Sequence, residues 1–115
     1  MADALAPAGR CGIDTVAIAR IERLLDATPA EDLRKFFSAQ ELEDSGEGPG
    51  RAASLAACFA AKEACVKLFP REAALGQIEP EDFAIVRDDY GAPRVVCGTR
   101  AEDLLARHGI ASIAV

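Results

Sequence analysis

The chain has 115 residues, of which half are apolar and 28% are charged. This composition fits one globular domain and excludes a disordered or fibrous protein. Nineteen acidic side chains outweigh thirteen basic ones, for a net charge of −6. That balance argues against a nucleic-acid partner, because nucleic-acid-binding domains present a basic field. No apolar run is long enough to cross a bilayer, so we expect no membrane partner.

The beginning of the chain and its cysteines indicate a cytoplasmic protein. Residues 1–10 lack the cationic start and apolar block of an export signal, so we expect a mobile leader there and a single domain over 11–115. The cysteines do not have the spacing of a zinc site, and we expect reduced, core-forming thiols: Cys11, Cys58, Cys65 and Cys97.

The first quarter of the chain predicts a strand and a helix. Residues 11–14 are a short apolar stretch that ends in Asp14, and we interpret them as a strand running into a turn. Apolar residues recur at helical spacing over 16–27, and this helix places Arg20 and Arg23 on one face. Asp14 either caps the helix or presents its carboxylate to a metal at the end of the strand, and the pattern alone favours the cap.

Two capping boxes then predict two short helices. Thr28 and Glu31 form the first box, with Pro29 at the first helical position. Ser38 and Glu41 form the second box. Each box marks the start of a helix, so we expect one short helix after Thr28 and another after Ser38.

A long, nearly apolar helix follows the glycine-rich stretch 44–50, which we expect to be a mobile loop. The helix is predicted from about residue 51 to 69, and its apolar composition predicts that it is buried. Lys62, Glu63 and Lys67 interrupt it. These charges either form an ordinary surface pair, with Glu63 four residues before Lys67, or are held for chemistry.

The last third of the chain changes to β-type periodicity. Two apolar runs, 83–86 and 94–97, flank an Asp-Asp-Tyr-Gly turn at 88–91 and predict a hairpin. A helix is predicted between Thr99 and Gly109, where the glycine occupies the position after the C-cap. Residues 110–115 are predicted to be a final strand. The fold class is therefore α+β, a small, mainly antiparallel sheet packed with one long and several short helices.

The order and spacing of several motifs resemble one known family, the holo-acyl-carrier-protein synthases, which are small 4′-phosphopantetheinyl transferases. The most specific motif is a Phe-Ala-Ala-Lys-Glu-Ala string. The matching segments are Gly12-Ile13-Asp14, Ala19-Arg20-Ile21, Phe36-Phe37-Ser38-x-x-Glu41-Leu42, Phe59-Ala60-Ala61-Lys62-Glu63-Ala64 with Lys67, and Gly91-x-Pro93-x-Val95. The resemblance implies the 4′-phosphopantetheinyl transferase fold, assembled as a homotrimer with its active sites between subunits.

The resemblance also implies a reaction. The phosphopantetheine arm of coenzyme A passes to a serine of an acyl carrier protein and releases adenosine 3′,5′-bisphosphate, with Mg²⁺ as cofactor. The attacking hydroxyl belongs to the substrate, which agrees with a sequence that shows no nucleophile–base motif. The resemblance does not decide between fatty-acid and polyketide biosynthesis.

Site residues follow from the resemblance by position. Asp14 and Glu63 are implied metal ligands, and Glu63 also helps to remove the serine proton. Lys62 and Lys67 are implied contacts of the coenzyme A phosphates, and both are implied to offset charge on the leaving group. Cys58 occupies the position where the family has a phosphate-binding arginine, and we include it among the cofactor contacts.

Partner binding is assigned to the first helix. Arg20 is implied to meet the acidic helix of the carrier protein, with Arg23 as its neighbour, which gives an acidic enzyme a cationic stripe for an acidic partner. The family's C-terminal Ser-x-Ser-His motif is missing after Ser112. The alternative function is therefore a catalytically impaired relative, which acts as a carrier-binding or structural subunit.

Overall fold

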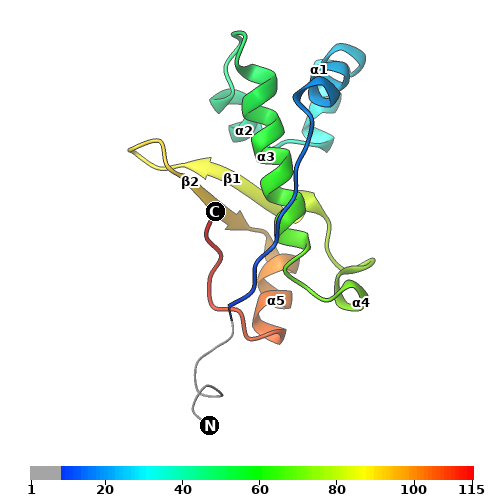
Figure 1. The fold of residues 1–115 in the computed structure, drawn as a ribbon, viewed down its shortest axis with the longest axis vertical. Coiled ribbons are helices and arrows are strands. Elements are labelled where there is room, and N and C mark those ends of the chain that lie inside the picture. The colour runs from blue at the N-terminus through cyan, green and yellow to red at the C-terminus, as the bar shows by residue number, and fades with distance from the viewer. Residues whose placement is uncertain (1–8) are drawn as a thin grey trace.

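A computed structural model describes residues 9–115, so the expected leader lies almost wholly outside the described part of the chain. The fold is α+β, with a single long helix, α3 (Arg51–Val66), at its centre. Figure 1 shows the other elements arranged around this helix, with a β-hairpin on one side of it. No helix in the described part of the chain has the length and apolar character that a membrane span requires.

Three helical elements precede α3. They are α1 (Ile18–Ala27), the 3₁₀ helix η2 (Ala30–Lys35) and α2 (Ala39–Asp44). The capping box at the start of α2 is confirmed, because the Ser38 hydroxyl accepts the Glu41 N–H at 3.0 Å and the Glu41 carboxylate accepts the Ser38 N–H at 2.9 Å.

The other predicted capping box does not form. The 3₁₀ helix η2 follows Pro29, which occupies the N-cap position without any side-chain hydrogen bond. A proline in that position places Thr28 one residue too early to cap the helix. The short helix is confirmed, but it is a 3₁₀ helix, in which the side chain of Leu33 is buried.

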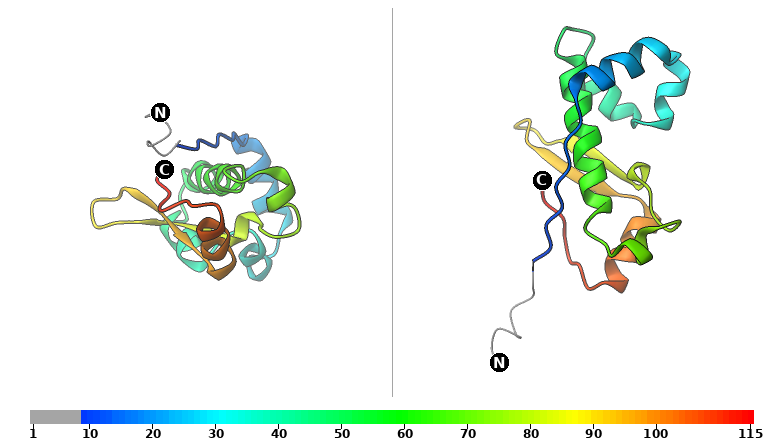
Figure 2. Two further views of the ribbon diagram at one scale, coloured as in Figure 1. Left: turned by 90° about the horizontal axis from the view of Figure 1, so that it is seen from below. Right: turned by 45° about the vertical axis from the view of Figure 1, so that its right-hand side comes forward.

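The long helix α3 joins two apolar clusters. One cluster packs α1 and the chain around Phe37 against the first half of α3, with core residues Ile21, Phe37, Leu55 and Ala56. The other lies beside the second half of α3, with core residues Cys65, Phe69, Ala74, Ile78, Phe83, Ala101, Leu104 and Leu105. Figure 2 shows α1 and α5 near opposite ends of α3, so this one helix contributes to both cores.

The hairpin forms as predicted. Strand β1 (Phe83–Arg87) pairs antiparallel with β2 (Pro93–Cys97), with Ile85 opposite Val95. In the turn, the Asp88 carboxylate accepts the N–H groups of residues 90 and 92, both at 2.9 Å. The two short helical elements α4 (Arg71–Ala74) and η3 (Pro80–Asp82) precede the hairpin, and α5 (Thr99–Arg107) follows it.

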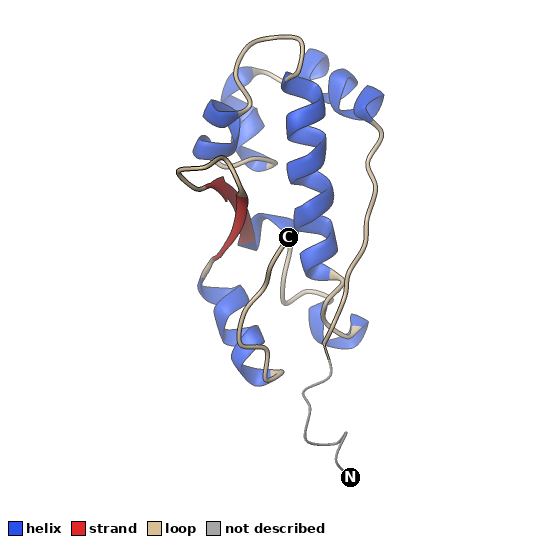
Figure 3. Cartoon of the chain, turned by 60° about the vertical axis from the view of Figure 1, so that its left-hand side comes forward, coloured by secondary structure: helices blue, strands red, loops and turns tan. Residues whose placement is uncertain are grey.

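Two predicted strands are not strands in the described chain. Residues 11–14 and 110–115 are extended, but neither segment is assigned to the sheet, which has two strands. Figure 3 shows both as loops. An extended segment becomes a strand only when another backbone lies beside it at about 4.8 Å. Here the apolar side chains of Ile110 and Ile113 pack on the core cluster instead, and a cavity lies between the two segments.

Candidate active site

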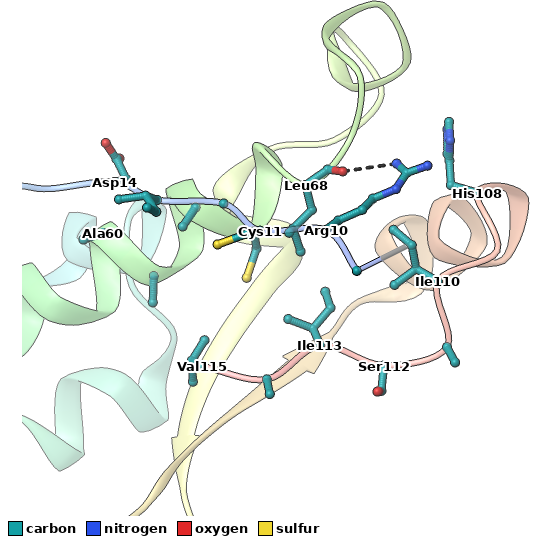
Figure 4. Close-up of a pocket in the computed structure, with 18 of the residues that line it drawn as sticks. Arg10, Cys11, Asp14, Ala60, Leu68, His108, Ile110, Ser112, Ile113 and Val115 are labelled. Carbon is teal, nitrogen blue, oxygen red and sulfur yellow. Dashed lines mark hydrogen bonds between the residues drawn. The ribbon is translucent and has the colours of Figure 1, made fainter. Parts of the chain in front are cut away.

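The extended segment before α1 lies directly against α3. A Cβ atom on Gly12 would collide with the main-chain oxygen of Ala64, so only glycine allows this close approach of two backbones. The contact fixes the path of the chain over the second half of α3. The segment runs antiparallel to α3, with Arg10 at Leu68 and Gly12 at Ala64, and Figure 4 shows Asp14 near Ala60.

Asp14 meets Lys67, the C-cap residue of α3. The Lys67 Nζ lies 3.1 Å from the Asp14 Oδ1 and donates a second hydrogen bond, of 3.2 Å, to the main-chain oxygen of Ile13. The N-cap of α1 is Ala17, and no side chain caps that helix. The capping interpretation of Asp14 is therefore wrong, as is the surface-pair interpretation of Lys67, whose ion pair is with Asp14.

Glu63 lies one helical turn before Lys67 on the same helix and is half-buried. Within residues 9–115, no group of three or more histidine, cysteine or acidic side chains is placed to hold a metal ion. Mg²⁺ often binds through only one or two carboxylates and takes its remaining ligands from water and substrate phosphates. Asp14 and Glu63 are carboxylates of the type that Mg²⁺ uses, and the exposed Lys67 lies beside Asp14.

Two predicted cofactor contacts lie inside the protein instead. The Lys62 side chain is 2% exposed, and its ammonium lies 2.9 Å from the Glu41 carboxylate. Cys58 is also buried, and burial, followed by the nearby Glu41 carboxylate, raises the pKa of its thiol. The reason is the helical period, which turns residues 58 and 62 toward β1 and α2, away from Asp14. Neither Lys62 nor Cys58 remains among the residues that we assign to coenzyme A.

The arginines predicted for partner binding do share one face. Arg20 and Arg23 are both exposed on α1, and they border a small hollow of about 290 Å³ whose apolar walls include Phe36 and Phe59. The Arg20 guanidinium lies 5.3 Å from the centre of the Phe59 ring, which is a cation–π contact. The result is an apolar hollow with a cationic rim, suited to an acidic, amphipathic surface.

A larger cavity, of about 950 Å³, adjoins Asp14. It lies between the N-terminal segment 9–14 and the C-terminal residues 108–115, over the α3 face that carries Ala60 and Ala64. Figure 4 shows Asp14 and His108 on opposite sides of this cavity, and the hydrogen bond of 3.2 Å from Arg10 to the main-chain oxygen of Leu68. The cavity is therefore mostly apolar, and the Asp14 carboxylate lies at one side of it.

Sequence reasoning missed the role of Glu41. Its capping-box motif was correct, but the same carboxylate also accepts the Ile85 N–H at 2.7 Å and pairs with Lys62. Nothing in the spacing of residues 41, 62 and 85 indicates that they meet. The only available signal was the occurrence of Lys62 in an otherwise apolar helix, which predicts a buried partner of opposite charge.

Comparison with known proteins gives a consistent result. The family model described as the 4′-phosphopantetheinyl transferase superfamily matches residues 10–112. The holo-[acyl-carrier-protein] synthase of Moorella thermoacetica is 38% identical over 105 residues, which are 90% of this chain and 79% of the relative. That of Trichlorobacter lovleyi is 38% identical over 101 residues, which are 88% of this chain and 79% of the relative.

Solved structures with the same fold bear the same description. The crystal structure of holo-[acyl-carrier-protein] synthase from Neisseria meningitidis matches with a TM-score of 0.69 and 26% identity, over 90% of this chain and 82% of that one. The Helicobacter pylori holo-[acyl-carrier-protein] synthase in complex with coenzyme A matches with a TM-score of 0.67 and 26% identity, over 89% and 83% of the two chains.

Proposed function

The chain belongs to the holo-acyl-carrier-protein synthases of the 4′-phosphopantetheinyl transferase superfamily, and from this membership we propose its reaction. Phosphopantetheine passes from coenzyme A to a serine of an apo acyl carrier protein. The second product is adenosine 3′,5′-bisphosphate. Mg²⁺ is the proposed cofactor, and the cytoplasm is the proposed location.

The reaction needs no nucleophile from the enzyme. The serine hydroxyl of the carrier protein attacks the β-phosphorus of coenzyme A and forms a new P–O bond. The bond from that phosphorus to the bridging oxygen breaks, and the bridging oxygen leaves with the adenosine bisphosphate. The serine proton passes to Glu63, directly or through water, so that the enzyme supplies alignment, proton transfer and charge neutralisation.

Asp14 and Glu63 would hold the magnesium ion. When bound there, Mg²⁺ supplies positive charge to the diphosphate and helps to align it for attack. Lys67 is 54% exposed, so its ammonium is open to a phosphate oxygen. We assign Lys67 to the leaving phosphate, where its charge is most useful as the P–O bond breaks.

The observation that carries this proposal is the contact between Asp14 and Lys67. It joins residues 53 positions apart, and it places the Asp14 carboxylate beside Lys67, which follows Glu63 by one helical turn. A purely structural surface pair of this exposure contributes only about 0–1 kcal/mol to stability. The close approach of Gly12 to Ala64, which leads the chain to Asp14, supports a functional reason for the placement.

The hollow on α1 is the proposed docking site for the carrier protein. Arg20 and Arg23 would pair with acidic residues of the carrier, and the walls of Phe36 and Phe59 would take an apolar side chain. Charge complementarity of this kind speeds association and selects the partner.

A homotrimer is the proposed assembly. Apolar side chains exposed on the single chain support it, among them Ile13, which is 74% exposed beside Asp14. Light scattering after size-exclusion chromatography measures the mass, and a monomer at working concentration would contradict the proposal.

A mass assay tests the reaction. Apo acyl carrier protein is incubated with coenzyme A, MgCl₂ and the enzyme, and it should gain the mass of one phosphopantetheine group. Glu63→Gln should abolish the gain while the circular dichroism spectrum stays unchanged, because the amide can neither accept the proton nor bind the metal as a carboxylate does. Wild-type activity in Glu63→Gln would contradict its role, and carrier binding without any mass gain by the wild-type protein would favour the non-catalytic alternative.

A further inference from the structure

A buried ion pair joins α2 to α3, through Glu41 and Lys62. The side chains of Glu41 and Lys62 are 0% and 2% exposed, and they meet at 2.9 Å. Lys62 also donates a hydrogen bond of 2.9 Å to the main-chain oxygen of Phe36, and its Nζ lies 5.6 Å from the centre of the Phe37 ring. The Glu41 carboxylate accepts three hydrogen bonds, from Lys62 and from the N–H groups of Ser38 and Ile85.

The contacts of Lys62 hold its ammonium inside the protein, where the side chain is 2% exposed. An ammonium group has three N–H donors: two are taken by oxygen acceptors, and an aromatic ring lies within cation–π range of the nitrogen. An amine that is enclosed in this way cannot also neutralise a phosphate at the surface. The pair must therefore serve the site through the groups that it holds.

The group that Lys62 holds most directly is Phe36. Its main-chain N–H donates to Leu33 at 3.0 Å, and its oxygen accepts from Lys62 at 2.9 Å, so the peptide groups on both sides of its Cα are fixed. Phe36 is 37% exposed and forms one wall of the hollow that Arg20 borders. Lys62 is thus a link from α3 to the end of η2, the segment that supplies this wall.

A single stretch of α3 carries a wall of the hollow, the buried lysine and the proposed catalytic glutamate. Phe59 forms the opposite aromatic wall of the hollow, Lys62 fixes Phe36 three residues later, and Glu63 is the neighbouring residue. A buried ion pair is a poor source of net stability, because removing two charges from water costs about as much as their attraction returns. Its value here lies in the fixed positions of the groups that it connects.

We infer that Glu41 and Lys62 are positioning residues for carrier-protein recognition, which hold Phe36 in place as a wall of the docking hollow. The inference rests on the proposed function, because it takes the hollow to be the carrier site. It assigns Lys62 to selecting the protein substrate, whereas the family resemblance implied a contact with coenzyme A for this lysine.

The test uses a double variant, Glu41→Gln with Lys62→Met. Removing one charge alone would leave the other buried and unpaired, which would strongly destabilise the fold. The double variant removes both charges and keeps an amide oxygen for Ser38 or Ile85. Glu41→Asp is a second variant, which keeps both charges and shortens the carboxylate side chain by one methylene. The matched control is Asp82→Asn with Arg100→Met, because this pair, at 2.8 Å, joins η3 and α5 on another part of the molecule.

Steady-state kinetics should separate the two substrates. We expect the KM for apo carrier protein to rise about tenfold in the double variant, which corresponds to about 1.4 kcal/mol, and to rise by a smaller factor in Glu41→Asp. The KM for coenzyme A should change less than twofold in both. Phe36→Ala should raise the KM for the carrier by a similar factor, and adding it to the double variant should have little further effect, because both act on one wall. The control pair should change neither KM.

Three results would overturn the inference: an unchanged carrier KM in both variants, an equal rise in the KM for coenzyme A, or full additivity with Phe36→Ala. Titration of each protein with apo carrier protein, without coenzyme A, gives the Kd and does not depend on catalysis. If the wild-type protein binds the carrier but transfers nothing, the proposed reaction fails, while the Kd values still decide the role of the pair.

Discussion

Gly12→Ala tests whether the close backbone approach builds the active site. The new methyl group would overlap the main-chain oxygen of Ala64, and neither backbone can move without disturbing α3 or the segment before α1. Overpacking of this kind costs about 1–3 kcal/mol. For a domain of this size, such a cost lowers the Tm by roughly 4–12 °C.

The same substitution should reduce activity, because Asp14 follows Gly12 by two residues. Displacing a catalytic group by about 1 Å can cost roughly a hundredfold in rate, so we expect kcat/KM to fall by about tenfold to a hundredfold. Differential scanning calorimetry and the mass assay measure the two effects. Gly48→Ala is the matched control, because a Cβ at that position meets nothing within 4 Å. If Gly12→Ala and the control behaved alike in both assays, the close approach would not position Asp14.

Two further predictions concern Lys67 and Cys65. Lys67→Met should lower kcat/KM for coenzyme A at least tenfold while the free energy of unfolding changes by less than about 1 kcal/mol, because the Asp14 pair is partly exposed; unchanged kinetics would refute the assignment to phosphate. Burial raises the pKa of the Cys65 thiol from 9.0 to about 11, so the stability that this thiol contributes is present below pH 9 and lost as the pH rises toward 11. Urea unfolding from pH 8 to 11 should show a steeper loss of stability in the wild type than in Cys65→Ala, and equal slopes would contradict the prediction.

The sequence was most informative where short-range patterns determine structure. The apolar period before residue 27, the Ser38 capping box, the alanine-rich run of α3 and the Asp88 turn each depend on residues a few positions apart, and each produced the predicted element. The position of Arg20 and Arg23 on one face of α1 was predictable from helical spacing for the same reason. Asp14 and Lys67, by contrast, were named through the family resemblance, and their mutual contact was not foreseen.

Predictions failed where distant segments decide the outcome. Whether residues 11–14 pair as a strand depends on which backbone lies beside them, and the sequence does not contain that information. Lys62 and Glu63 are adjacent in the chain, so they point to different sides of α3, and the direction of each depends on how the helix is rotated against β1. The burial of Cys58 follows from the same rotation. The Phe-Ala-Ala-Lys-Glu-Ala motif therefore identified residues 59–64 as important. It did not show which of their side chains are buried and which are exposed.

The alanines of α3 limit the mutational tolerance of the molecule. The N-terminal segment lies on one face of this helix at Ala64, while Ala56 belongs to the core shared with α1. Small side chains let both neighbours approach the helix axis closely, so a larger residue at either position would push a whole segment outward. We conclude that sequence variation in this protein should concentrate in the 44–50 loop and the hairpin turn, and be rarest along a helix whose commonest residue is chemically inert.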